Sequence, residues 1–413
     1  MTDPTTDQTA TTATQEPEGR RRFAFMFGSD PNPYPYYHEL RERGRVLQVG
    51  ENLWLVSGHP EAVRILRDPR ISVDARKAPK LQARGRVRGL SREGVGAPSL
   101  LRIDAPDHTR LRNLVTKAFS ARVVQDLRPS MQEMTDELLD QAHQVGGMEV
   151  VGELAYPLPI HVICGMLGVP AEDRELFTSW SDKVARIPSA PDRYKSAAQR
   201  RRATVESQAY LQNLIEEHRA EPRDDLLTKL IDVEEQGHLS DDELVSIMIL
   251  LLIAGHETTV NLITNGIYTM LRNPDQLSLL QDDPSLIVTA VDELLRYESP
   301  VQRVSRFSVE DFEIDGKVIP EQDDIVIMLG AANRDPAVFV DPDRLDITRE
   351  DNRHLAFAAG AHFCLGAALA RAEGQIAIGT LLRRYPNATV VEDEVVWRNS
   401  AALRGLSTLP IRF

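Results

Sequence analysis

The sequence contains very little cysteine: Cys164 and Cys364 are the only thiols in 413 residues. Two cysteines are too few for a disulfide framework, so we expect a reducing compartment and a cytoplasmic location. Cys164 lies in an apolar helical pattern and is expected to be a small buried hydrophobe. The composition, with 42% apolar and 27% charged residues, is that of an ordinary globular protein.

The chain also lacks an excess of positive charge and any long apolar run. Its net charge of −14 argues against nucleic acid as a bulk partner, because phosphate binding requires a basic surface. The longest apolar run, residues 247–254, is far below the ~20 residues of a membrane-spanning helix. Three arginines at 20–22 precede five apolar residues, fewer than the ~7–15 of an export signal. We therefore expect a soluble cytoplasmic protein with no membrane partner.

The periodicity of the sequence predicts a mainly α protein with a smaller β region. Residues 1–22 are polar and Thr-rich, which predicts a disordered tail before a single domain over 23–413. Hairpins are predicted around 50–52 and 315–316, with further strands in 388–398. Helices are predicted over 107–119, 120–143, 159–167, 194–219, 241–271, 284–297 and 365–384. The segment 241–271 is apolar on most faces and should be buried through the middle of the molecule.

Cys364 lies in "FAAGAHFCLG", directly before a predicted helix. The positive end of a helix dipole favours a thiolate, which can bind a metal or attack carbon. His362 is a poor candidate for a catalytic base, because neighbours two residues apart rarely face one another. A zinc site would need more soft ligands than this chain offers. Gly360 and Gly366 would let a flat partner approach the backbone, so a haem ligand remains one of the open alternatives.

The pattern F-x-x-G-x-H-x-C-x-G at 357–366 resembles the haem-ligand loop of the cytochrome P450 family. The resemblance extends from about residue 30 to the end, and the family's usual glycine after Phe357 is replaced by Ala358. It implies the cytochrome P450 fold, with heme b between the long central helix and the cysteine loop. By this resemblance Cys364 is the axial ligand of the iron, and Phe357, Gly360, His362 and Gly366 surround the cofactor.

Glu293 and Arg296 in "ELLR" are three residues apart on one predicted helix face. Alone they would be an ordinary surface ion pair worth under ~1 kcal/mol. They match the E-x-x-R motif of the cytochrome P450 family, whose partner is an arginine before the cysteine loop. The resemblance makes Arg344 in "DPDRLD" the expected third member of a structural triad.

The segment "AGHETT" interrupts the long apolar helix with polar residues. A zinc-protease helix is excluded because Val260 occupies the position four after His256. The Thr258 hydroxyl can bond the carbonyl four residues back, either to satisfy itself or to open a notch in the helix. The segment is similar to the family's oxygen-activation site, which implies proton relay by Glu257 and Thr258. Ala254 and Gly255 would then leave room for oxygen.

Haem propionates must meet cations or hydrogen-bond donors when buried. The resemblance assigns this role to four residues in three segments that resemble those of the family, although each alone would more often be a surface group. These residues are His108, Arg112, Arg306 and His354.

The resemblance implies a monooxygenase that hydroxylates a C–H bond or epoxidises an alkene. The motifs look most like those of actinobacterial enzymes that tailor macrolides and other polyketides, so the expected substrate is a neutral or oxygen-rich macrolactone. Steroids and fatty acids are alternatives for the substrate. Peroxide-driven oxidation, a rearrangement, or a non-catalytic scaffold are alternatives for the function.

The chain contains no flavin or nucleotide fingerprint, so electrons should come from a ferredoxin and a ferredoxin reductase. An acidic ferredoxin would need a local basic patch near Cys364, for which Arg110, Lys117 and Arg371 are candidates. By family analogy 74–98, 170–200 and 300–305 line the substrate pocket. Residues 74–98 carry seven Lys/Arg against two Asp/Glu, and are either a solvated basic loop or a pocket wall that disfavours cationic substrates.

Overall fold

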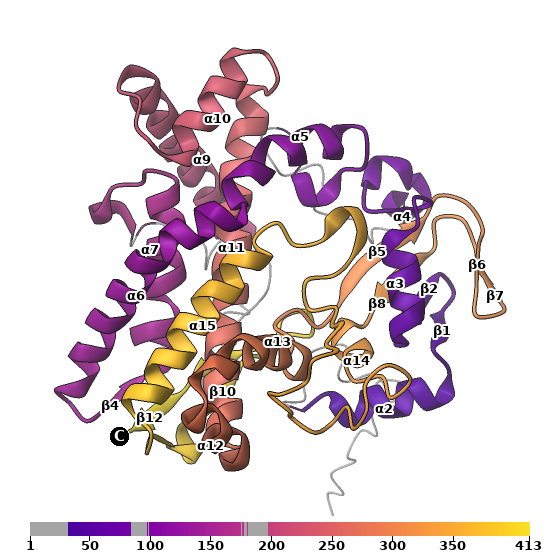
Figure 1. The fold of residues 1–413 in the computed structure, drawn as a ribbon. Coiled ribbons are helices and arrows are strands. Elements are labelled where there is room, and N and C mark those ends of the chain that lie inside the picture. The colour runs from indigo at the N-terminus through magenta and orange to yellow at the C-terminus, as the bar shows by residue number, and fades with distance from the viewer. Residues whose placement is uncertain (1–31, 84–96, 98, 175, 177–179, 181–196) are drawn as a thin grey trace, which may run out of the picture.

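The structure is a computed structural model that describes residues 32–83, 97, 99–174, 176, 180 and 197–413. Helices predominate in the described chain, as predicted (Figure 1). They are α2 (Tyr34–Arg43), α3 (His59–Arg67), α4 (Pro79–Ala83), α5 (Asp107–Thr116), α6 (Ala121–His143), α7 (Pro157–Met166), α9 (Ala197–Ala220), α10 (Leu226–Glu235), α11 (Asp241–Leu271), α12 (Pro274–Asp282), α13 (Ile287–Tyr297), α14 (Leu329–Ala332) and α15 (Ala367–Arg384).

The strands are short and form several small sheets. They are β1 (Val46–Gly50), β2 (Leu53–Val56), β3 (Ile71–Ser72), β4 (Gly147–Glu149), β5 (Val304–Ser308), β6 (Phe312–Ile314), β7 (Lys317–Ile319), β8 (Asp324–Ile327), β9 (Thr389–Val390), β10 (Val396–Trp397), β11 (Leu406–Thr408) and β12 (Pro410–Arg412). The largest sheet has the order β1-β2-β8-β5-β3, in which only β2 and β8 are parallel.

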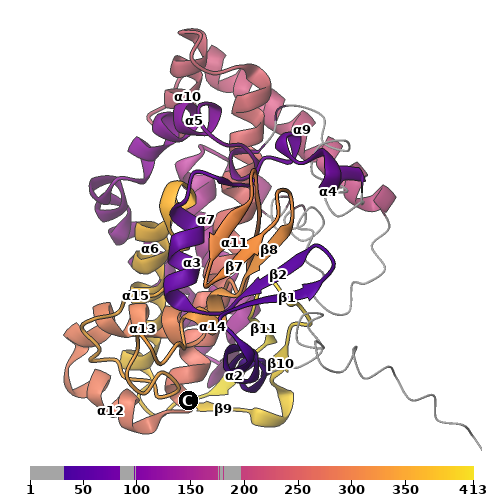
Figure 2. The same cartoon turned by 90° about the vertical axis from the view of Figure 1, so that its right-hand side faces the viewer.

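Helix α11 begins and ends at the predicted residues and runs through the middle of the molecule (Figures 1 and 2). A capping box starts it: the Ser240 hydroxyl accepts the Glu243 N–H, and the Glu243 carboxylate accepts the Ser240 N–H at 2.9 Å. The helix is long and apolar enough to cross a membrane, but most of its apolar window is buried against other helices, chiefly α15, α7, α13 and α9. Its composition is therefore that of a core helix.

The predicted hairpins are confirmed. β1 pairs with β2, and β6 pairs with β7 through Asp315 and Gly316, whose φ angles of 52° and 67° suit the turn. The strands predicted in 388–398 also exist, but they do not pair with each other. β9 joins β12 and β10 joins β11, so their partners come from the last eight residues of the chain. The C-terminal segment is thereby folded back toward α11.

The two largest apolar cores follow this division of helices and sheet. The larger lies among the helices and includes Leu158, Ile263 and Ile378. The smaller lies between the main sheet and α3 and includes Ile65 and Ile325. Because β2 pairs with β8 from much later in the chain, helical and sheet regions interleave along the sequence.

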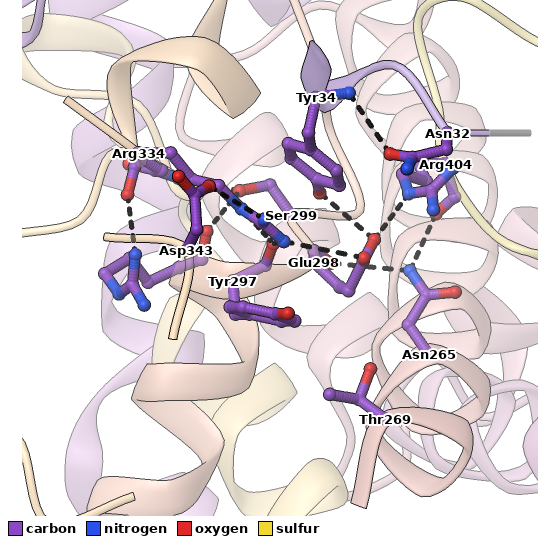
Figure 3. A network of polar contacts seen from close by, with 12 residues as sticks. Asn32, Tyr34, Asn265, Thr269, Tyr297, Glu298, Ser299, Arg334, Asp343 and Arg404 are labelled. Carbon is purple, nitrogen blue, oxygen red and sulfur yellow. Dashed lines mark hydrogen bonds and ion pairs between the residues drawn. The ribbon is translucent and has the colours of Figure 1, made fainter. Parts of the chain in front are cut away.

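A buried polar network ties α2 to the centre of the molecule (Figure 3). The Tyr34 hydroxyl donates to Glu298 at 3.0 Å, and the Arg334 guanidinium carbon lies 3.5 Å from the Tyr34 ring centroid. Glu298 also pairs with Arg404, whose carbonyl accepts a hydrogen bond from Asn265 of α11 at 3.0 Å. The network joins the start of the described chain, α11 and the C-terminal segment.

Some predictions fall outside the described residues. The tail over 1–22 lies there, as do 84–96 and much of 170–200. The part of 74–98 that the structure describes contains a short 3₁₀ turn, Ala75–Lys77, and α4. A single domain over 23–413 stays a prediction.

Candidate functional site

Cys364 lies between a 3₁₀ turn, Gly360–His362, and the start of α15. Its backbone N–H donates to the Phe357 carbonyl at 3.0 Å, and its side chain is exposed. Although the sulfur is accessible, protein surrounds it on most sides, and this desolvation raises the pKa of the thiol. The Gly366 N–H and the guanidinium groups of Arg112 and Arg371 oppose the shift without overcoming it. The helix start therefore acts on the thiol in the predicted direction, through the Gly366 N–H, but burial outweighs it.

The glycines of the loop serve different purposes. Gly360 has a φ of +73°, and a Cβ there would lie 2.1 Å from the Leu66 carbonyl oxygen. Its small size is therefore needed for contact with α3, which corrects the prediction that it makes room for a flat partner. A Cβ on Gly366 would have nothing within 4 Å, so this position leaves open space beside Cys364. Ala358 has a φ of 57°, in the left-handed region, which explains why glycine is usual there.

Two histidines from distant segments meet beside the cysteine loop. The ring centroids of His108 on α5 and His362 are 4.2 Å apart. His108 Nε2 is buried and has no hydrogen-bond partner in the described structure. Arg112, one turn further along α5, donates a hydrogen bond to the Phe363 carbonyl at 2.6 Å. A buried imidazole nitrogen without a partner, close to a guanidinium, indicates a site for an anionic or hydrogen-bonding group.

The electrostatics of this cluster support the same conclusion. Burial, followed by the charges of His108 and Arg306, lowers the pKa of His362 to about 4. Burial and the neighbouring Arg102 lower the pKa of Arg306 to about 10, against the opposing effect of Asp104. Cationic groups that depress one another's pKa are stabilised by an added anion. The arrangement of His108, Arg112, Arg306 and His362 thus fits the carboxylates of a haem.

His354 does not belong to this cluster. Its Nε2 lies 3.2 Å from Asp292 Oδ1 on α13, and its Nδ1 accepts the Ala356 N–H at 3.2 Å. Both ring nitrogens are therefore occupied by protein groups. The predicted role of His354 in holding a propionate was wrong, because packing of the loop against α13 turns the ring toward Asp292.

The notch predicted in α11 is present. The Thr258 hydroxyl donates to the Ala254 carbonyl at 3.0 Å, and the Thr259 hydroxyl donates to the Gly255 carbonyl at 2.8 Å. Ala254 and Gly255 are exposed in the middle of an otherwise buried helix, and a Cβ on Gly255 would have nothing within 4 Å. The hydroxyl bond satisfies Thr258 and leaves open space on the same helical turn, so the two interpretations of this residue coexist.

The Glu257 carboxylate has an ion-pair partner that the sequence analysis missed. Its Oε1 accepts a hydrogen bond from Arg398 Nη1 at 3.1 Å, and both side chains are almost fully buried. Arg398 follows β10 and also donates to the Leu406 carbonyl at 3.1 Å. No local pattern could have identified it, because the contact depends on how the C-terminal hairpin folds onto α11.

Glu373 is a second functional candidate that the sequence analysis missed. This carboxyl on α15 is 2% exposed and hydrogen-bonds with Thr259, next to Thr258. Burial raises its pKa to about 8, so it is largely protonated at neutral pH. The available signal was a glutamate on the same predicted helix face as the apolar residues Leu369, Ile376 and Ala377, since an unpaired charge is rarely placed on a buried helix face.

The E-x-x-R pair is buried, and its third member is not Arg344. Arg296 Nε donates to Glu293 Oε2 at 2.7 Å, with both side chains at 0% exposure. Arg349 Nε lies 3.2 Å from the same oxygen, whereas Arg344 is exposed and contributes only its carbonyl, to Arg296 Nη2 at 3.2 Å. The prediction was wrong because the chain turns after Leu345 and brings the next arginine inward.

Two of the three cations proposed for partner docking are neutralised by acids. Arg110 pairs with Glu243, and Arg371 pairs with Asp292 at 2.7 Å. Lys117 is exposed and makes no ion pair within the described residues. A basic patch near Cys364 therefore has fewer free charges than the sequence suggested.

The described cations of 74–98 are also paired at the surface. Lys77 lies 2.9 Å from Asp104, Lys80 lies 3.4 Å from Glu321, and Arg76 pairs with Asp74. Each cation is about half exposed, so this part of the segment is a solvated basic surface. In the described part of the chain, no group of three or more His, Cys, Asp or Glu side chains is placed to hold a metal ion.

Comparison with known proteins agrees with this geometry. The family model "Cytochrome P450" matches residues 50–290 and 281–400. The chain is 44% identical over 386 residues to cytochrome P450 107B1 of Saccharopolyspora erythraea, spanning 91% of this chain and 94% of that protein. It is 42% identical over 395 residues to 6-deoxyerythronolide B hydroxylase of the same organism, spanning 92% and 95% of the two chains.

The fold is also that of solved relatives. The structure of the myxobacterial cytochrome P450 CYP267B1 in complex with myristic acid is 40% identical, with a TM-score of 0.87 over 95% of this chain and 98% of that one. Members of this family carry a haem held by a cysteine thiolate. The chain therefore belongs to the cytochrome P450 family and is a cytochrome P450 monooxygenase.

Proposed function

We propose that this enzyme inserts one oxygen atom into a C–H bond or an alkene of a large, neutral or oxygen-rich polyketide such as a macrolactone. One atom of O₂ enters the product, and the other leaves as water with two electrons and two protons. The observation that carries the proposal is the accessible Cys364 thiol beside two imidazoles and two guanidinium groups, those of His108, His362, Arg112 and Arg306. Such a site suits a heme b that has an axial thiolate and two carboxylates.

When bound, the haem supplies the electron transfer and oxygen activation, and the protein supplies orientation and protons. Ala254 and Gly255 leave open space beside Thr258 on α11. Thr258 and Glu257 are the proposed proton donors, and Arg398 holds the Glu257 carboxylate. Glu373 adds a buried acid that is largely protonated at neutral pH, hydrogen-bonded to Thr259. These proton donors favour O₂ over hydrogen peroxide as the oxidant. Cleavage of O₂ requires protons and electrons from outside, whereas hydrogen peroxide already contains them.

The substrate class is supported by relatives rather than by a single contact. One relative is named as a hydroxylase of 6-deoxyerythronolide B, whose name denotes a lactone, and another was crystallised with myristic acid. We favour a neutral macrolactone, with a fatty acid or a steroid as the alternative. A cationic amino-sugar substrate is disfavoured if cations in 84–96 face the pocket.

We propose that a ferredoxin and a ferredoxin reductase deliver the electrons to a soluble cytoplasmic enzyme. A chain of net charge −14 repels an acidic ferredoxin at long range, so docking should depend on a local group of cations, for which the exposed Lys117 is the candidate without an ion pair in the described residues. Turnover should therefore fall as ionic strength rises. Turnover that is insensitive to salt would contradict the local patch.

The decisive experiment is the absorption spectrum of the reduced, carbon-monoxide-bound protein. A Soret maximum at the thiolate position is expected for the wild type and should be lost in Cys364→Ala. Loss of the band in Cys364→Ala combined with its retention in Cys164→Ala would assign the ligand. The same spectrum in Cys364→Ala and wild type would overturn the proposal.

Substrate class is tested by titrating the oxidised protein with neutral macrolactones, amino-sugar macrolides, fatty acids and steroids. A low-spin to high-spin change with neutral macrolactones is expected. Conversion only with amino-sugar macrolides would exclude the proposed class. Activity with hydrogen peroxide equal to that with ferredoxin would favour a peroxide-driven enzyme, and no substrate-dependent consumption of reductant would favour a non-catalytic role.

A further inference from the structure

Four side chains from three parts of the chain meet next to the Cys364 loop. Asp292 on α13 accepts a hydrogen bond from Arg371 Nε of α15, with the nitrogen 2.7 Å from Asp292 Oδ1. His354 Nε2 lies 3.2 Å from the same oxygen. A single carboxylate therefore holds both the arginine and the histidine.

The two groups held by Asp292 both contact the aromatic ring of the cysteine loop. The Arg371 guanidinium carbon lies 4.6 Å from the centroid of the Phe357 ring, within the range of a cation–π contact. The His354 ring centroid is 5.8 Å from the same ring. Phe357 is buried, and its carbonyl accepts the Cys364 N–H at 3.0 Å. Asp292 is thus connected to Cys364 by three successive contacts, which pass through Arg371 or His354 and then through Phe357.

The same residues also interact through their charges. Burial opposes ionisation of Asp292, but hydrogen bonds from His354 and Arg371 outweigh it and lower its pKa, so the group is a carboxylate at neutral pH. The Arg371 charge lies on the ring of Phe357, the residue whose carbonyl accepts the Cys364 N–H. The Arg371 side chain is 32% exposed, so without an anchor the guanidinium gains conformational freedom and hydration by moving into solvent.

We propose that Asp292 is a positioning residue for the cysteine ligand. It holds the Arg371 guanidinium on Phe357 and within electrostatic reach of Cys364, and thereby makes the iron easier to reduce. The direction follows from charge, because a nearby cation stabilises the electron-rich thiolate and the less positive, reduced iron. The inference rests on the proposed haem-thiolate function and deepens it.

The test is a potentiometric titration of the haem-loaded protein. Arg371→Gln removes the cation and should shift the reduction potential to more negative values. We expect about a threefold change in the ferric–ferrous equilibrium constant, or about 30 mV at 59 mV per tenfold for one electron. Asp292→Ala should shift the potential in the same direction, because Arg371 then leaves its place. Asp292→Asn keeps the shape and an acceptor oxygen, so its shift should be smaller.

A double-mutant cycle separates positioning from simple charge removal. If Asp292 acts through Arg371, Asp292→Ala should give no negative shift in the Arg371→Gln background. A positive shift in the native background would mean that Asp292 acts only as a counter-charge, and equal shifts in both backgrounds would mean that it acts independently of Arg371. Either result would overturn the inference, as would no shift at all.

A matched control is available on the same helix. Asp136 pairs with Arg384 near the other end of α15, so Asp136→Ala breaks an Arg–Asp pair far from Cys364 and should leave the potential unchanged. The Soret maximum of the reduced carbon-monoxide complex is also measured for each variant. A wild-type protein without the thiolate band means that the proposed function fails. A normal band in every variant without any shift of potential means that only this inference fails.

Discussion

Arg398 Nη1 donates a hydrogen bond to Glu257 Oε1 at 3.1 Å across 141 residues of sequence. The two side chains are 5% and 11% exposed, so the ion pair is largely shielded from water. Glu257 belongs to the "AGHETT" segment of α11, whereas Arg398 follows β10 in the C-terminal hairpin. The acid proposed to deliver protons is therefore held by a segment that the motif does not contain.

Arg398→Gln should destabilise the protein and reduce the coupling of electrons to product. Removing one partner of a buried pair leaves an uncompensated carboxylate, which costs about 3 kcal/mol of unfolding free energy. The variant also favours the neutral form of Glu257, so less product should form per reducing equivalent consumed. Urea denaturation and the ratio of product to reductant measure the two effects. The exposed Arg412→Gln is the control, and equal stability of the two variants would contradict the expectation.

The two arginines near Glu293, Arg349 and Arg344, should contribute differently to the free energy of unfolding. Arg349→Ala removes a charged hydrogen bond to the buried Glu293 carboxylate and should cost about 2 kcal/mol of unfolding free energy. Arg344→Ala should change it by less than about 0.5 kcal/mol, because only its backbone carbonyl contacts Arg296. The two unfolding curves measure this difference, and a larger loss in Arg344→Ala would restore the original assignment.

Ala358→Gly should stabilise the protein. Ala358 has a φ of 57°, a conformation in which a Cβ costs roughly 1–2 kcal/mol. Glycine relieves this strain but gains entropy in the unfolded chain, so we expect a net increase of about 1 kcal/mol in unfolding free energy. Ala356→Gly, at a buried position without a positive φ, should have the opposite effect. A destabilised Ala358→Gly variant would show that the backbone is not strained there.

Glu373 should make stability depend on pH. Its pKa of about 8 in the folded protein exceeds the usual 4.5, so the folded state holds one more proton than the unfolded state between these values. Its contribution to stability is complete below about pH 4.5 and is lost as pH rises toward 8.

Relative to Glu373→Gln, the wild type should lose about 1.4 kcal/mol of unfolding free energy per pH unit between about pH 5.5 and 7.5. Isothermal urea denaturation across this range measures the slope, with the exposed Glu42→Gln as control. Parallel pH profiles for the wild type and Glu373→Gln would show that Glu373 is ionised like an exposed carboxylate.

Local patterns determined much of this protein. The capping box and apolar periodicity defined α11 from Asp241–Leu271, and Asp315-Gly316 defined a hairpin, because such signals act over a few residues. The cysteine loop and the E-x-x-R pair were also evident, since their spacing is set within one turn or one helix. The position of Cys364 before a helix, the central helix and the fold class could therefore be predicted from sequence.

Only the tertiary structure decided which partners these residues have. Arg349 rather than Arg344 reaches Glu293, His354 turns toward Asp292, and the acids at 257 and 373 meet Arg398 and Thr259. These contacts join residues about 55 to 140 positions apart, a separation at which one arginine or histidine cannot be distinguished from another by spacing. Burial selects among them, because a charge removed from water must find its partner within the packed core.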